Sequence, residues 1–257
     1  MKRRTTRARL RRSLCDSAAQ SVHLLLKTAA EDASAARHER IAVIGGSEET
    51  VAQMVNRAKA VNSERVVLVG PDIASDGGGT MSAVFAAAAV AAVIAGNTDP
   101  SVPINGAELT LFGAAGKRLS DNEIDQLVRG GVTPIETVGG VSSPVRGITT
   151  KTSSGGAADT TWRELTTILI VDEVIPTIRS ALRTRFARSK NTAQSRGAIR
   201  SQVVLELEEM KSREIVDSYG EVLVSALKSD PTVCLVEFSF TVAHGLNRIY
   251  LTAHITV

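Results

Sequence analysis

Two short apolar runs, at 41–44 and 66–69, constrain the fold of this chain more than any other feature. Ile41–Ile44 is followed by Gly45-Gly46-Ser47, and Val66–Val69 is followed by Gly70-Pro71-Asp72. The stretch between them, Glu48–Val61, has its apolar residues at helical spacing. Two continuous apolar strands joined by a helix indicate a βαβ unit whose parallel strands are covered on both faces. We therefore predict an α/β chain, with a partial parallel βαβ sheet domain first and an α+β C-terminal domain after it.

Further elements of the first domain follow from capping and composition. Met81–Gly96 is rich in alanine and shorter than the ~20 residues that span a membrane, so it is predicted to be a buried helix. Ser120 and Glu123 form a capping box, which predicts a helix start at that point. Val132–Val138 is predicted to be a strand interrupted by Pro134.

The best internal boundary lies in 142–159, a stretch rich in serine, threonine and glycine. After it, Leu165–Val171 is predicted to be a strand, and Asp172 is predicted to cap a helix that runs to about Ala187 with Pro176 in its first turns. A second helix is predicted over Ser195–Lys211.

The first of these two helices carries a basic C-terminal half. Its bases are Arg179, Arg183, Arg185, Arg188 and Lys190. Such bases complement the helix dipole, and they are also a candidate intersubunit patch. Both interpretations stay open at this point.

The chain continues with strands. Val222–Leu227 is one, and Val233–Val242 alternates, with Cys234 at the start of its apolar face. Arg248–Val257 alternates again and is expected to form a terminal antiparallel hairpin with the strand before it. Its apolar face consists of Ile249, Leu251, Ala253, Ile255 and Val257. Its backbone needs partners, from its own sheet or from another chain.

Charge and aromatic content restrict the partners. Residues 1–12 hold seven bases and no acid, and without those bases the formal net charge of +3 becomes −4. The basic residues 1–37 are therefore predicted to be a disordered tail, which could contact nucleic acid or an anionic surface. Aromatic residues make up only 3% of the chain, which argues against the stacking platforms of single-strand binding.

No residue pattern predicts catalysis, a cofactor or a metal. Gly45-Gly46 after a strand is reminiscent of a dinucleotide-binding turn, but the third glycine of that pattern is missing. A βαβ nucleotide-binding enzyme that uses this turn is the alternative. The four histidines have no metal-ligand spacing, and Cys15 and Cys234 indicate neither a disulfide framework nor a metal site.

Several stretches in order resemble contractile phage tail sheath proteins. They include Ile94–Ser101, Leu119–Val132, Val145–Thr150, Asp159–Asp172 with the basic helix after it, and the final alternating strands from Asp230. The resemblance covers about residues 41–257. It implies a non-protease domain of subtilisin-like fold at 38–147 and a sheath C-terminal domain at 148–257. Family members carry a longer N-terminal part, which residues 1–37 do not resemble, so the subtilisin-like domain is expected to be incomplete.

The resemblance also implies a mechanical function without an enzyme activity, a cofactor, a small-molecule substrate or a membrane span. Sheath subunits stack in hexameric rings around an inner tail tube protein and meet baseplate and tail terminator proteins. They contract to drive the tube through a target cell envelope. Their terminal arms complete a sheet with strands of adjacent subunits, which makes residues 249–257 the candidate intersubunit strand. The expected location is a virion tail, a prophage-encoded particle or another injection particle, assembled in the bacterial host cytoplasm.

Overall fold

The main sheet of the protein has five strands in the order β1-β2-β3-β6-β7. The computed structural model describes residues 11–14, 17–74, 79–109 and 114–247. The strands β1 (Arg11–Leu14), β2 (Arg40–Gly45), β3 (Val66–Gly70) and β6 (Val132–Val138) are parallel, and β7 (Val141–Pro144) is antiparallel to β6. The predicted βαβ unit is confirmed by β2 and β3, which pair in parallel from Ala42 with Val66 to Gly45 with Val69.

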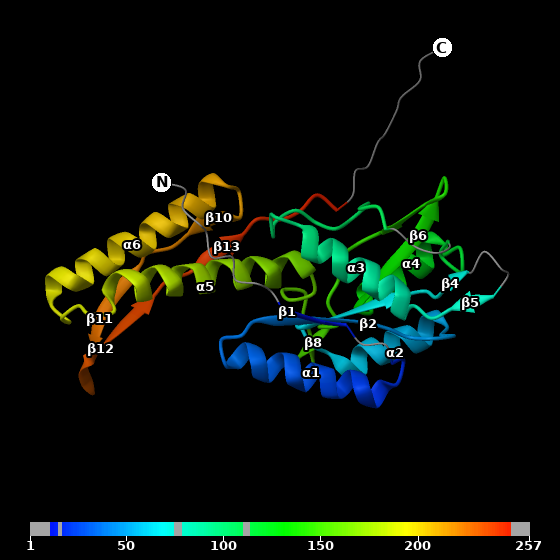
Figure 1. Cartoon of the computed structure of the whole chain (residues 1–257), viewed down its shortest axis with the longest axis horizontal. Helices are drawn as coiled ribbons and strands as arrows, with labels where there is room; N and C mark the ends of the chain where they lie inside the picture. The colour runs from blue at the N-terminus through cyan, green and yellow to red at the C-terminus, as the bar shows by residue number, and fades with distance from the viewer. Residues whose placement is uncertain (1–10, 15–16, 75–78, 110–113, 248–257) are drawn as a thin grey trace, which may run out of the picture.

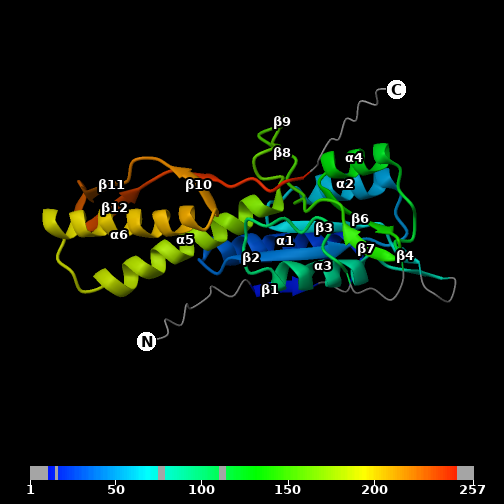
Figure 2. The same ribbon diagram turned by 90° about the horizontal axis from the view of Figure 1, so that it is seen from above.

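Each face of this sheet buries its own apolar cluster. On one face, alternate residues of β2 and β3 pack against α1 (Gln20–Ala35), α2 (Val51–Val61) and α4 (Asp121–Arg129). On the other face, the intervening residues pack against α3 (Val84–Gly96) and the start of α5 (Leu165–Phe186). Figure 1 shows this sheet between α3 on one side and α1 and α2 on the other. Figure 2 shows α2 and α4 on one side of the sheet and α3 on the other. The continuous apolar strands follow from this double coverage.

The helix starts and the buried alanine-rich helix agree with the predictions. Ser120 and Glu123 form the capping box of α4, and Thr50 with Gln53 forms a second capping box at α2. The alanine-rich stretch forms α3, whose small residues let it lie close to the sheet. No helix in the described part of the chain is long and apolar enough to cross a membrane.

The prediction of a disordered tail over 1–37 is wrong where the structure describes regular elements. Residues 11–14 form β1 of the main sheet, and residues 20–35 form α1, which lies on the same face as α2. Its contact is narrow: Val22 and Leu26 pack against the core, and His23 is fully buried with Nε2 2.8 Å from the Ser17 carbonyl oxygen. Burial lowers the pKa of His23, which favours the neutral form of its ring. Because α1 buries few apolar residues, its sequence shows little helical periodicity, and the helix was not predicted.

The prediction for 165–187 is also wrong in detail. Leu165–Val171 is not a strand but the first part of α5, so Asp172 is a buried residue inside this helix rather than its cap. Pro176 accordingly lies in the middle of α5, not in its first turns. The first residues of α5 are buried on all sides of the helix. Their apolar side chains therefore show no helical period, and in the sequence they have the pattern of a buried strand.

The C-terminal body consists of α5, α6 (Ala193–Ser212) and four strands. The predicted helix over 195–211 is confirmed by α6. The strands are β10 (Val216–Tyr219), β11 (Leu223–Leu227), β12 (Asp230–Glu237) and β13 (Phe240–Val242), and they pair as β10-β13 and β11-β12. The predicted single strand over 233–242 is thus divided between two small sheets. Its inward face, which includes Val236, Phe238 and Phe240, packs on the helices as expected.

The structure describes only the first strand of the predicted terminal hairpin, so the hairpin stays a prediction. The antiparallel partner of β12 is β11, and the partner of β13 is β10. The other predicted member, 248–257, lies outside the described residues. Two short pairs complete the fold: β4 (Ile73–Ala74) with β5 (Thr80–Met81), and β8 (Ser153–Ser154) with β9 (Ala157–Ala158).

Candidate assembly surfaces

Helix α5 joins the two bodies of the protein because it belongs to both cores. Leu165, Ile168 and Leu169 pack under the main sheet, whereas Ile170, Val174 and Ile178 pack against α6 and the C-terminal strands. Two ion pairs fasten the same helix to the main sheet. Arg65 at the start of β3 lies 2.5 Å from Asp172, and Glu39 lies 3.1 Å from Arg179. The bodies therefore share one continuous element rather than a flexible linker.

The Asp172 carboxylate is held in an unfavourable environment. Its side chain is 1% exposed, and its Oδ1 atom has no hydrogen-bond partner within the described residues. Burial raises the pKa of Asp172 to about 6, although the neighbouring Arg65 acts to lower it. A buried ion pair of this kind adds little stability and acts mainly by penalising arrangements that separate the partners.

The tip of the α5–α6 hairpin is basic. Residues 174–205 contain seven bases and no acid. Of the predicted patch, Arg179 is paired with Glu39, and Arg185 donates a hydrogen bond to Gln202. Arg183 and Arg188 are exposed and have no ion pair within the part of the chain that the structure describes. The structure thus leaves two of the four predicted arginines available to a partner.

Helix-dipole stabilisation does not explain the charge order along α6. Arg196 and Arg200 lie in its N-terminal half, and Glu206, Glu208 and Glu209 lie in its C-terminal half. This order is the reverse of the one that the dipole favours. The acid-free run from 174 to 205 was visible in the sequence, and it extends the basic surface from α5 into α6.

The β11–β12 sheet has one packed face and one bare face. Val224 and Val236 pack inward against the helices. Leu223, Val233 and Leu235 point the other way, and they are 52%, 41% and 41% exposed. Among the described residues no further strand pairs with either outer edge of this sheet. An apolar face and open edges together are features of a surface that another chain covers.

The Gly45-Gly46 turn does not form a phosphate site. A Cβ atom at Gly45 would lie 2.4 Å from the backbone of Ala83 and Val84, so this glycine allows α3 to approach β2. A Cβ atom at Gly46 would lie 2.1 Å from Glu49 Oε2. The space above the turn is therefore occupied by a carboxylate, which would repel a phosphate.

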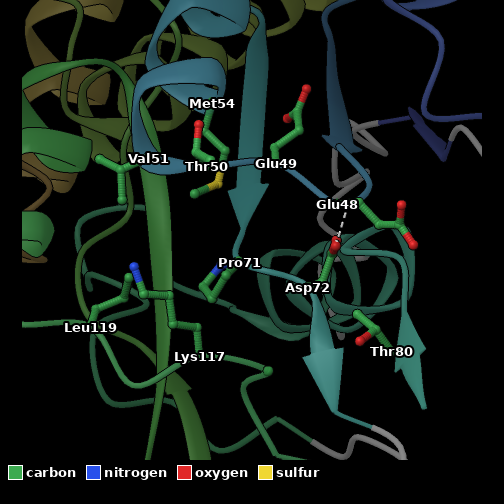
Figure 3. A pocket seen from close by; sticks show the side chains of 11 residues that line it. Glu48, Glu49, Thr50, Val51, Met54, Pro71, Asp72, Thr80, Lys117 and Leu119 are labelled. Atoms are coloured by element: carbon green, nitrogen blue, oxygen red, sulfur yellow. Dashed lines mark hydrogen bonds between the residues drawn. The ribbon is translucent and has the colours of Figure 1, made fainter.

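A cavity of about 180 Å³ lies beside this turn, at the carboxyl ends of β2 and β3 (Figure 3). Its charged lining is mostly acidic: Glu48, Glu49 and Asp72 against Lys117. Lys117 pairs with Glu123 at 2.5 Å, and Asp72 accepts hydrogen bonds from the backbone N–H groups of Glu48 and Ala83. Lys117 and Asp72 therefore already have partners in the protein, and most of the charged lining groups would repel an anionic ligand.

The described residues contain no cluster of metal ligands, and the predicted intersubunit strand lies outside them. No group of three or more histidine, cysteine or acidic side chains within the described residues could hold a metal ion. Cys234 is a free, half-buried thiol in β12. The predicted intersubunit strand residues Ile249, Leu251, Ala253, Ile255 and Val257 lie outside the described residues.

Comparison with known proteins finds similarity to phage tail sheath proteins. The phage tail sheath C-terminal domain family matches residues 157–256. A tail sheath protein of Bacillus phage SP01 is 28% identical over 224 residues, which are 85% of this chain and 38% of the relative. The chain therefore spans well under half the length of that relative.

Solved structures agree in fold. A sheath tail protein from Listeria innocua superposes with a TM-score of 0.71 at 13% identity, over 90% of this chain and 52% of that one. The sheath complex of an extracellular contractile injection system in its contracted state superposes with a TM-score of 0.63 at 13% identity, over 85% and 64%.

The protein is thus a mixed α/β protein with the fold of contractile tail sheath proteins. More narrowly, the match to the phage tail sheath C-terminal domain family covers residues 157–256, which are less than half of the chain. Nothing in these comparisons supports the nucleotide-binding alternative.

Proposed function

We propose that this chain is a structural subunit of a contractile tail sheath, which polymerises around an inner tube and contracts to drive the tube through a target cell envelope. The observation that carries the proposal is the match of residues 157–256 to the sheath C-terminal domain, within a fold that superposes on sheath proteins.

The joint between subunits is the apolar strand at 249–257, which adds to the β11–β12 sheet of the next copy. A two-stranded sheet is marginally stable alone, and its open edges are templates for a further strand. A donated strand supplies a row of backbone hydrogen bonds and one apolar face. The bare edges and the exposed Leu223 and Leu235 of the described sheet support this assignment.

The basic tip of the α5–α6 hairpin is a second contact between copies. Its complement is present on the same chain, because residues 206–237 carry eight acids and three bases. A surface that meets a different surface of the next copy gives a heterologous contact, which produces rings or helical filaments. Arg183 and Arg188 are the residues of the predicted patch that contribute to it.

The remaining partners follow from the same proposal. The assembled subunits form hexameric rings that contact a tail tube protein inside and baseplate and tail terminator proteins at the two ends. Assembly takes place in the bacterial host cytoplasm, and the product is a phage tail or a related injection particle. The domains at 38–147 and 148–257 act as the two bodies of the subunit, with α5 extending into both.

Deletion of residues 249–257 tests the joint. We expect the shortened chain to lose polymers in negative-stain micrographs and to sediment as a monomer, with an unchanged far-UV circular dichroism spectrum. The spectrum is preserved because the helices and strands that form the described apolar clusters all remain in the shortened chain. A chain with Ile249, Leu251 and Ile255 replaced by valine is the control and should still polymerise. Normal polymers from the deleted chain would contradict the proposal.

A further inference from the structure

The described part of the chain ends at Asn247, and this residue is fastened to the first body. Asn105 Nδ2 donates to Asn247 Oδ1 at 2.8 Å, while Asn105 Oδ1 accepts from the Gly147 N–H at 3.1 Å. Gly245 lies against Pro103, where a Cβ atom would come within 2.9 Å of the proline ring. We call Pro103, Asn105, Gly245 and Asn247 the exit clamp. It uses the loop after α3, whose sequence carries part of the resemblance to sheath proteins.

The exit clamp lies at the end of α5 that is remote from the β11–β12 turn. Asn247 lines the same small cavity as Leu165, the first residue of α5. Asn191, shortly after the last residue of α5, donates to the Pro231 carbonyl oxygen in β12 at 2.7 Å. Figure 1 shows the chain crossing from β13 toward the main sheet, away from β11 and β12. The start of residues 248–257 and the turn of their own β11–β12 sheet are thus separated by the length of α5.

The lengths decide what the clamped segment can reach. The 22 residues of α5 span about 33 Å. Ten extended residues span at most roughly 36 Å. If the exit clamp holds, residues 248–257 would need nearly all of that length to reach Pro231. They could not then pair along the whole of β12 in the same chain. Released as far back as Ala243, whose N–H bonds to the Ile215 carbonyl oxygen, it would gain about 17 Å and could do so.

We infer that the exit clamp is the device that makes strand pairing intermolecular: it directs residues 248–257 away from their own β11–β12 sheet and toward that of a second copy. This inference rests on the proposed strand joint. Asn105, Asn247, Pro103 and Gly245 are therefore positioning residues, and the partner is another copy of this chain. If the clamp is loosened, residues 248–257 can pair with the β11–β12 sheet of the same chain. The edge that a neighbouring copy would use is then occupied.

The asparagine pair provides matched variants. Asn105→Asp combined with Asn247→Asp keeps the oxygen that accepts from Gly147 but removes every N–H donor from the pair, so two carboxylates face and repel each other. Asn247→Asp alone keeps the accepting oxygen and the Asn105 donor, and it is the control. Gly245→Ala opens the clamp independently, through Pro103. Gly96→Ala is its control, since a Cβ atom there meets nothing within 4 Å.

The test places one thiol on β12 and one in the terminal segment of the full chain. Leu235→Cys and Thr252→Cys are introduced after Cys15→Ser and Cys234→Ser, and a flexible bismaleimide is added at low protein concentration. The clamped chain should give intermolecular products. The double change Asn105→Asp with Asn247→Asp, and separately Gly245→Ala, should raise the ratio of internal to intermolecular cross-links about fivefold, the effect of one lost hydrogen bond, and should shorten the polymers. Asn247→Asp and Gly96→Ala should leave the ratio unchanged.

The outcomes separate the two ideas. Equal ratios in all five chains, with circular dichroism showing that each is folded, would overturn the clamp while leaving the strand joint standing. A parent chain that yields neither cross-link would refute the joint itself, and the clamp with it.

Discussion

At the scale of single residues, the glycines at the end of β2 have a packing role where their sequence suggested a ligand. Gly45 allows the backbone of α3 to contact β2, and Gly46 makes room for the Glu49 carboxylate. Glu49 in turn pairs with Arg57 at 2.5 Å. The same residue types in a nucleotide-binding protein would leave this space empty for a phosphate. The distinction depends on which side chain occupies the turn.

Gly45→Ala is expected to destabilise the protein by about 1–3 kcal/mol, because the new methyl group meets backbone atoms that cannot move aside. Thermal unfolding would show this as a fall in Tm. The matched change Gly96→Ala, at the end of α3 with open space around it, should leave Tm unchanged or raise it slightly. Equal effects of the two substitutions would contradict the close approach at Gly45.

At the scale of elements, α5 shows how one helix can belong to two cores. Its first turns are enclosed by the main sheet and α3, and its later turns by α6 and the C-terminal strands. Its burial therefore changes side along its length, and no single apolar stripe runs through it. The ion pair of Asp172 with Arg65 lies where this change occurs.

The pH dependence of stability should reveal Asp172. Its folded pKa, about 6, is above the ordinary 3.8, so the protonated form favours the folded state. The resulting stabilisation is complete below pH 3.8 and is lost as the pH rises through 6. The shift corresponds to at most about 3 kcal/mol. Urea unfolding from pH 4 to 7 should show this loss in the parent chain and a flatter curve in Asp172→Asn.

Glu123 supplies a control of opposite sign for that measurement. Its hydrogen bonds with Lys117 and Ser120 lower its pKa to about 2. Its contribution is present above pH 4.5 and is lost as the pH falls through 2. Glu123→Gln should therefore leave the fall in stability between pH 5 and pH 7 in place, because the Glu123 contribution is nearly constant over that range. A parent curve as flat as that of Asp172→Asn would contradict the assignment to Asp172.

At the scale of the whole molecule, the exposed features lie where a neighbour would meet them. The acid-free hairpin tip, the bare β11–β12 face and the exit of the chain at Asn247 belong to the C-terminal half, which is also the half that the sheath family matches. The main sheet, in contrast, has both faces covered.

Reversing the charge of the hairpin tip should weaken assembly without unfolding the subunit. We expect Arg183→Glu with Arg188→Glu to shorten polymers at low salt and to abolish the salt sensitivity of their length, because both arginines are exposed and unpaired within the described residues. Sedimentation at 50 and 500 mM salt measures this. Arg129→Glu is the control, on an exposed arginine of α4. Unchanged polymers from the doubly reversed chain would remove the tip from the interface.

Local sequence patterns predicted an element correctly where a single contact surface determines which of its residues are buried. The apolar runs of β2 and β3, the capping box at Ser120 and the small residues of α3 each predicted the structure observed. They were insufficient where burial comes from several directions, as at Leu165–Val171, or from few contacts, as in α1. The sequence predicted the candidate arginines from their charge alone. It did not predict which of them have partners, since Glu39 and Gln202, which contact Arg179 and Arg185, are distant in sequence.

The sequence by itself determined the α/β class, the parallel strands and the two-part organisation, because alternation, capping and apolar runs are properties of neighbouring residues. Only the tertiary structure decided that α5 is one helix shared by two cores, that Asp172 is buried against Arg65, and that β12 pairs with β11. It also decided that the chain leaves at Asn247 beside Asn105. Each of these depends on contacts between residues far apart in the chain, whose energy appears only when the packed neighbours are present.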